Sequence, residues 1–198
     1  QQLGTVVNAM RGIAAARAQQ ARGQLAAVDG YEAIIAGGIG SALALIPTHP
    51  EAAPPLVRPA LIVFAAEQGF AGAFSDRVFD FVGQDLDGST LFLVGTRGAT
   101  VLAERGITPD WSGALPAHSA GIPKLADQIV EALYARIVTG EIVRLDVIFA
   151  ESEAGHPPVM QRSALLPLAI GKVMGQSPRT TPRLNLAQTQ CRPGRHVD

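Results

Sequence analysis

Two glycine-bearing turns are the strongest candidates for chemistry in this chain. The first, Glu67–Gly72 (Glu-Gln-Gly-Phe-Ala-Gly), follows an apolar run and precedes a helical pattern, which is where an α/β fold places a phosphate-binding turn. It has neither Gly-x-Gly-x-x-Gly nor Gly-Lys-Ser/Thr. A tight turn that allows close helix–strand packing is therefore favoured over a nucleotide loop.

The second turn, Gly95–Gly98 (Gly-Thr-Arg-Gly), follows another apolar run. Arg97 and a helix N-terminus could bind an anion there. Arginine is mostly exposed in folded proteins. We therefore favour a turn with a solvated arginine.

The remaining reactive side chains form no recognisable catalytic or metal set. The histidines are scattered, the single cysteine has no partner, and Ser75-Asp76 lies outside a Gly-x-Ser-x-Gly elbow. Two acidic residues follow an apolar strand pattern, but no base or electrophile accompanies them. We expect no metal, cofactor or catalytic residue; the side chains concerned are His49, His118, His156, His196, Cys191, Glu151 and Glu153.

Apolar runs alternate with helical patterns from residue 60 onward, as in a twisted, mostly parallel sheet of about five strands with helices on both faces. The sequence predicts strands at 60–66, 90–95, 111–115, 143–150 and 158–168, and helices at 73–84, 100–105 and 122–139. This pattern places the chain in the α/β class.

A long helix precedes these elements. Residues 3–46 contain no proline, and as one helix they would extend roughly 65 Å at about 1.5 Å per residue. A 3.5-residue spacing gives a seam that is apolar at both ends and small or polar between, typical of close helix–helix contact over part of the length; it runs through Leu3, Val7, Met10, Ala14, Arg17, Ala21, Gln24, Val28, Tyr31 and Ile35. Gly37-Gly38 is the expected site of a kink or fraying.

Composition excludes several classes of protein. The net charge of −1 gives no electrostatic basis for binding nucleic acid. No run approaches the ~20 apolar residues of a membrane span, and no signal peptide is expected. We expect residues 47–59 to be a proline-rich linker and residues 169–198, with five basic residues against one acidic, to be an irregular, disordered tail.

Five segments in the same order resemble the gamma subunit of F-type ATP synthases. Val7–Ala21 resembles the start of that family's N-terminal helix, and Leu61–Ser75 its strand and Ser-Asp-Arg-Gly-Leu-Cys-Gly turn. The others are Gly95–Gly98, Gly140–Phe149 and Leu165–Leu168. Together with the resemblance, the sequence divides into four parts: a coiled-coil helix (1–46), the linker (47–59), a Rossmann-like α/β domain (60–168) and the tail (169–198).

The resemblance also implies a rotor without covalent chemistry of its own. Its helix would form a coiled coil inside the hexamer of alpha and beta subunits, and its α/β domain would contact epsilon and the c-ring at the cytoplasmic side of the bacterial inner membrane. The membrane would be touched only through the c-ring. The partner contacts implied are Met10, Arg11, Ala14, Arg17, Gln20, Gly69 and Gly72.

Departures from the family pattern indicate a divergent bacterial branch. Glu67-Gln68 replaces Asp-Arg in the turn, Ala71 replaces cysteine, and no C-terminal helix follows Leu168. Two other interpretations stay open at this point. One is a nucleotide-binding protein or enzyme on the same α/β fold; the other is a free-standing interaction module whose helix docks in a partner's groove.

Overall fold

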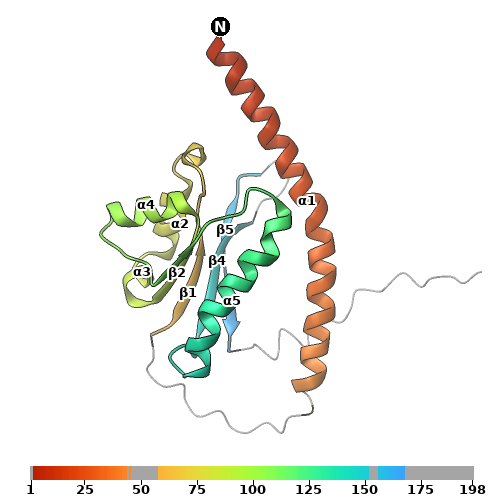
Figure 1. Ribbon diagram of the computed structural model, residues 1–198, viewed down its shortest axis with the longest axis vertical. Helices are drawn as coiled ribbons and strands as arrows, with labels where there is room; N and C mark the ends of the chain where they lie inside the picture. The colour runs from red at the N-terminus through yellow and green to blue at the C-terminus, as the bar shows by residue number, and fades with distance from the viewer. Residues whose placement is uncertain (1, 44, 46–57, 152–155, 168–198) are drawn as a thin grey trace, which may run out of the picture.

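The structure, a computed structural model, describes residues 2–43, 45, 58–151 and 156–167. Its first element is the predicted long helix, α1 (Gln2–Leu43), which stands beside the rest of the protein and extends beyond it at the N-terminal end (Figure 1). The helix continues through Gly37-Gly38, and the Ser41 hydroxyl donates a hydrogen bond to the Gly37 carbonyl at 2.9 Å. The helix is therefore continuous at the expected site of a kink or fraying.

A five-stranded sheet forms the centre of the second part. Its strands are β1 (Ala60–Phe64), β2 (Thr90–Val94), β3 (Trp111–Gly113), β4 (Leu145–Glu151) and β5 (Val159–Leu166), in the order β3-β2-β1-β4-β5. The first four run parallel and β5 is antiparallel to β4. The predicted α/β fold is confirmed. Each strand boundary lies within two residues of its predicted position.

Helices cover both faces of the sheet. On one face lie α2 (Phe74–Val82), the short α3 (Asp85–Gly88) and α4 (Thr96–Glu104); on the other lies α5 (Ile122–Val138). Alternate strand residues feed the two cores, as period-2 geometry requires. Leu61 and Val63 pack against α2 and α4, whereas Ala60 and Ile62 pack against α5.

Two helical features differ from expectation. The helix α3 was not predicted, because four residues are too short for a periodic signal. The helix α4 begins at Thr96, four residues before its predicted start, so the predicted turn at Gly95–Gly98 is in fact the first turn of that helix. The short 3-10 helices η1 (Gly69–Ala71) and η2 (Ser119–Gly121) precede α2 and α5.

The chain enters the first strand and leaves the last strand at the same end of the sheet's strands. Ala60, the first residue of β1, pairs with Leu145 of β4, which pairs with Leu166 near the end of β5. Residues 47–57 of the predicted linker and the predicted tail lie outside the described residues. Among the described residues, no helix combines the length and apolar character that crossing a membrane requires.

Candidate partner-binding site

Glu67 caps the N-terminus of α4, where an anion could otherwise bind. Its carboxylate accepts hydrogen bonds from the Thr96 backbone N–H at 3.0 Å, the Thr96 hydroxyl at 2.7 Å and the Leu115 backbone N–H at 2.8 Å. It thereby joins the loop after β1, the N-terminus of α4 and the segment after β3. Burial raises the pKa of Glu67, but these hydrogen bonds lower it more, and the net pKa is below its ordinary value.

This arrangement weighs against an anion at Gly95–Gly98, and the backbone of Gly72 favours the tight turn at Glu67–Gly72. An anion at the N-terminus of α4 would meet a carboxylate that already accepts the available N–H group. Gly72 has φ +57°, a conformation that glycine adopts without strain. Buried Ser75 accepts a hydrogen bond from the Ala66 N–H at 3.2 Å, so its hydroxyl has a structural partner.

The glycines of Gly95–Gly98 allow close approach of two segments. A Cβ at Gly95 would lie 2.6 Å from the Ala65 carbonyl oxygen, and one at Gly98 would lie 2.5 Å from the Ala65 Cβ. The Gly98 N–H also donates to the Ala66 carbonyl at 3.0 Å. Arg97 is exposed. These glycines hold α4 against the end of β1.

Of the scattered reactive residues, Glu151 and His156 come together at a small pocket of about 200 Å³ beside β4 and β5. No group of three potential metal ligands occurs in the part of the chain that the structure describes. Glu151 accepts a hydrogen bond from the Gln161 side chain at 3.0 Å. The residues His49, Glu153, Cys191 and His196 lie outside the described ranges.

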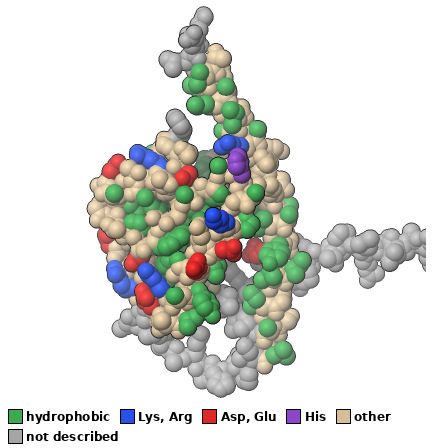
Figure 2. All heavy atoms as spheres, viewed as in Figure 1, with side chains coloured by type: hydrophobic (Ala, Val, Ile, Leu, Met, Phe, Trp, Pro, Cys, Tyr) green, Lys and Arg blue, Asp and Glu red, His purple; other side chains and the backbone are tan. Residues whose placement is uncertain are grey.

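The most unusual surface belongs to α1. Its large apolar side chains are about half exposed or more and lie within one half of the helix circumference at 100° per residue. They are Val6, Val7, Met10, Ile13, Leu25, Val28, Tyr31, Ile34 and Ile35. Figure 2 shows hydrophobic side chains exposed at several places along α1. So much exposed apolar surface in one stripe marks an interaction site.

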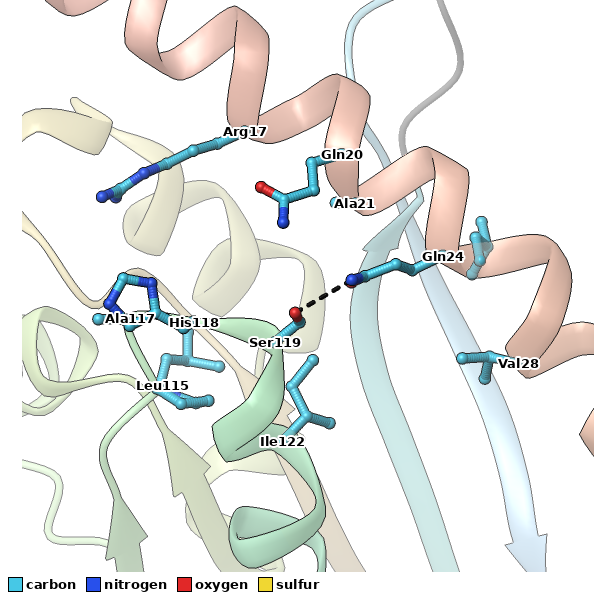
Figure 3. Close-up of a pocket in the computed structure, with 12 residues that line it drawn as sticks. Arg17, Gln20, Ala21, Gln24, Val28, Leu115, Ala117, His118, Ser119 and Ile122 are labelled. Carbon is cyan, nitrogen blue, oxygen red and sulfur yellow. Dashed lines mark hydrogen bonds between the residues drawn. The ribbon is translucent and has the colours of Figure 1, made fainter.

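A groove of about 410 Å³ separates the middle of α1 from the segment between β3 and α5. In Figure 3, Arg17, Gln20 and Gln24 project from α1 toward this segment, which contributes Leu115 and His118. The Gln24 side-chain amide donates a hydrogen bond to the Ser119 hydroxyl at 3.1 Å. The groove is polar around this hydrogen bond and apolar where Val28 and Ile122 line it.

The predicted contact residues divide into three places. Arg17 and Gln20 line the groove. Met10, Arg11 and Ala14 are exposed on α1 nearer its N-terminus. Gly69 and Gly72 lie in the exposed turn after β1 and do not line the groove.

The groove also contains residues that the sequence did not indicate. The second wall, including His118 and Ser119, comes from an irregular segment with no periodic pattern. Its position depends on the Leu115–Glu67 hydrogen bond, a contact between residues far apart in sequence.

Three solved structures that are similar to the chain are parts of ATP synthases. A chain of the Euglena gracilis mitochondrial ATP synthase rotor in rotational state 1 is 11% identical, with TM-score 0.43; the match covers 56% of this chain and 39% of that one. A chain of the Tetrahymena thermophila central stalk and c-ring is 17% identical, with TM-score 0.45 and coverage of 66% and 59%. A chain of the Euglena gracilis OSCP/F1/c-ring structure in rotational state 3 is 12% identical, with TM-score 0.42 and coverage of 55% and 35%.

The chain thus spans about two fifths to three fifths of the first two of these structures and about a third of the other. A search of curated protein sequences gives no match. The family model described as ATP synthase, that of the F-type gamma subunit, matches residues 1–191, past residue 168 where the five resembling segments end. Because that match covers nearly the whole sequence, this chain belongs to the gamma family of F-type ATP synthases.

Proposed function

We propose that this chain is a central stalk (gamma) subunit of a bacterial F-type ATP synthase, which transmits rotation of an ion-driven c-ring to the catalytic sites of the alpha/beta hexamer. The observation that carries the proposal is the length of α1 together with its exposed apolar side chains. Its 42 residues extend roughly 63 Å at about 1.5 Å per residue, and its large apolar side chains are exposed within residues 6–13 and 25–35.

Such a helix needs a partner. Helices in proteins derive most of their stability from tertiary packing. The helix α1 also carries glycines with open space around them, each costing up to about 1 kcal/mol relative to alanine: Gly4, Gly12, Gly23, Gly30, Gly37 and Gly38. We infer that the apolar half of α1 forms a coiled coil with a second helix and enters the hexamer. Met10, Arg11, Ala14, Arg17 and Gln20 would make its contacts.

The α/β domain would contact epsilon and the c-ring, with Gly69 and Gly72 in its exposed turn among the contacts. Attachment to the membrane would be peripheral, through the c-ring, on the cytoplasmic side of the inner membrane. We expect no covalent chemistry of its own, because the Glu67 carboxylate already accepts the Thr96 N–H at the N-terminus of α4, where an anion would bind.

Co-expression with the alpha and beta subunits of the same genome tests the proposal. We expect the three chains to copurify, and a variant starting at residue 17 to be lost from the complex because it lacks the first part of α1. A full chain that folds but fails to copurify would refute the stalk role. Separately, titration with ATP or NAD should give no micromolar binding; such binding would support the enzyme interpretation instead.

A second experiment examines which side of α1 meets its partner. A family-like C-terminal helix, fused after residue 198 by a flexible linker, should raise the helical content and the melting temperature. Ala14→Glu, on the seam, should remove most of this gain, whereas Ala15→Glu, on the opposite side, should keep it. Equal effects of both substitutions would mean that the seam is not the coiled-coil face.

A further inference from the structure

The α/β domain stands against the middle of the α1 seam. Consecutive seam residues line the groove between α1 and the segment that joins β3 to α5; they are Arg17, Ala21, Gln24 and Val28. The Gln24 side-chain amide donates its 3.1 Å hydrogen bond to Ser119 across this groove (Figure 3). The domain therefore approaches α1 on the same side on which the second helix of the proposed coiled coil would pack.

Ser119 and a paired helix cannot occupy this place together. A helix with its side chains is about 10–12 Å across, and the axes of two packed helices lie about 8–10 Å apart. Because Gln24 is a seam residue, a paired helix would lie directly over it. Ser119 lies there instead, at hydrogen-bond distance from the Gln24 amide. Pairing at this level therefore requires that the hydrogen bond break and that α1 separate from the segment.

The segment is fixed to the α/β domain more firmly than to α1. The Leu115 N–H donates to the Glu67 carboxylate at 2.8 Å, and the Gly121 N–H donates to the His118 carbonyl at 3.0 Å. Pro116 packs against Gly121, where an added Cβ would come within 2.6 Å of the proline ring. The hydrogen bond across the groove joins exposed side chains, and water can replace such a bond at little net cost. Separation is therefore a movement of α1 relative to the intact segment.

The polar middle of the seam suits this arrangement. Met10 lies before it and Val28 and Tyr31 lie after it, whereas Arg17 and Gln24 interrupt the apolar pattern. Polar residues in the core of a coiled coil lower its stability. Beside the α/β domain, the Gln24 amide has a hydrogen-bond partner and Arg17 is exposed to solvent. Both polar side chains are therefore accommodated while no second helix is present.

Given the proposed coiled coil, on which this step rests, we propose that the Gln24–Ser119 contact is a closed resting arrangement of α1 against the α/β domain, which the second helix displaces when it pairs with α1. The seam is then open for pairing only after α1 has separated from the segment.

A reversible cross-link tests whether the two arrangements exclude each other. Gln20 and Ala117 line opposite walls of the groove. Gln20→Cys and Ala117→Cys are introduced together with Cys191→Ser and joined by a bis-maleimide that contains a cleavable disulfide. The probe is the family-like C-terminal helix, added as a free fluorescent peptide and followed by anisotropy. We expect the joined protein to bind the peptide more weakly than the same protein after reductive cleavage, by roughly tenfold or more.

Ser119→Ala removes the hydrogen bond from the α/β side and leaves α1 unchanged. We expect it to raise the affinity for the peptide roughly threefold, because the small net contribution of one neutral hydrogen bond no longer opposes separation. Ser112→Ala is the matched control, since Ser112 is an exposed serine of β3 outside the lining of this groove. It should leave the affinity unchanged. Melting temperatures confirm that both variants are folded.

Two results would overturn the closed arrangement and leave the coiled coil in place: equal affinity of the joined and cleaved proteins, or a Ser119→Ala affinity no higher than that of Ser112→Ala. Absence of peptide binding to every form of the protein would refute the coiled coil, and the closed arrangement with it. Copurification with the alpha and beta subunits tests the stalk role independently of both.

Discussion

Replacing Glu67 by alanine removes a carboxylate that joins three segments of the α/β domain. Two backbone N–H groups, those of Thr96 and Leu115, and the Thr96 hydroxyl lose their acceptor. We expect α4 to lose stability at its first turn and the segment after β3 to become more mobile. Since Leu115 lines the groove beside α1, the effect should extend to the contact between Gln24 and Ser119.

The size of the effect follows from the hydrogen bonds. Loss of a capping side chain costs about 0.5–2 kcal/mol, and hydrogen bonds to a charged group contribute about 1.5–3 kcal/mol. Water can replace part of this at a half-buried site, so we expect a loss of about 2 kcal/mol in unfolding free energy. That corresponds to a decrease of roughly 8 °C in melting temperature for a domain of this size. Glu67→Gln, which keeps an acceptor but not the charge, should cost about half as much.

The effect should also depend on pH. The folded state lowers the pKa of Glu67 from its ordinary value of 4.5, so the ionised carboxylate stabilises the fold at pH values above 4.5. This contribution is lost as the pH falls from 4.5 through the lower folded-state pKa. The difference in unfolding free energy between the wild type and Glu67→Ala should therefore be constant at neutral pH and shrink in acid.

Urea unfolding between pH 3 and pH 7, followed by circular dichroism and Trp111 fluorescence, measures this difference. Gln68→Ala, at the exposed neighbouring position, is the control and should change stability by less than about 0.5 kcal/mol. A Glu67→Ala loss below that value at pH 7, or a loss that grows as the pH falls, would refute the assigned role of the carboxylate.

Three further substitutions test the core and the rod. Asp146 is 3% exposed; its carboxylate accepts a hydrogen bond from Arg162 Nε at 2.8 Å and lies 2.7 Å from Arg162 Nη2, whereas Arg144 Nη2 is 3.5 Å away. Arg162→Met should cost about 3 kcal/mol in urea unfolding, because the buried carboxylate would keep only the longer contact with Arg144; a cost below about 1 kcal/mol would contradict this. Gly98→Ala should destabilise by about 1–3 kcal/mol through overpacking against β1, while Gly88→Ala, with open space around its Cβ position, should not; equal effects would argue against the close approach. Gly37→Ala should raise the helical content in circular dichroism, with up to about 1 kcal/mol of stabilisation, because α1 is continuous there; no increase would mean that this turn is not helical in solution.

Local patterns predicted the elements that are long and regular. The apolar runs at Ala60 and Thr90 became strands buried over all or nearly all of their length, and the spacing of Leu125, Ile129 and Leu133 became the inner face of α5. These signals are contained within single segments, so they are readable without knowing the tertiary fold.

Contacts between distant segments were not readable in this way. The early start of α4 depends on Glu67, which is 29 residues away from Thr96 in sequence. The glycines at 95 and 98 are explained by Ala65, and the groove beside α1 by a segment that pairs with Glu67 only in the folded protein. Sequence located Arg17 and Gln20 on the rod but not what faces them.

Ala60, Leu145 and Leu166 lie side by side at one end of the strands, which makes the α/β domain an insertion in topological terms. The chain enters and leaves it two strands apart, a separation of about 10 Å at 4.8 Å per strand. A short peptide could span that distance, so the whole domain could be excised or exchanged with little displacement of the flanking chain. The same arrangement sets the mechanical behaviour of the domain. Tension that separates the start of β1 from the end of β5 acts across the sheet and opens the β1–β4 and β4–β5 ladders one hydrogen bond at a time.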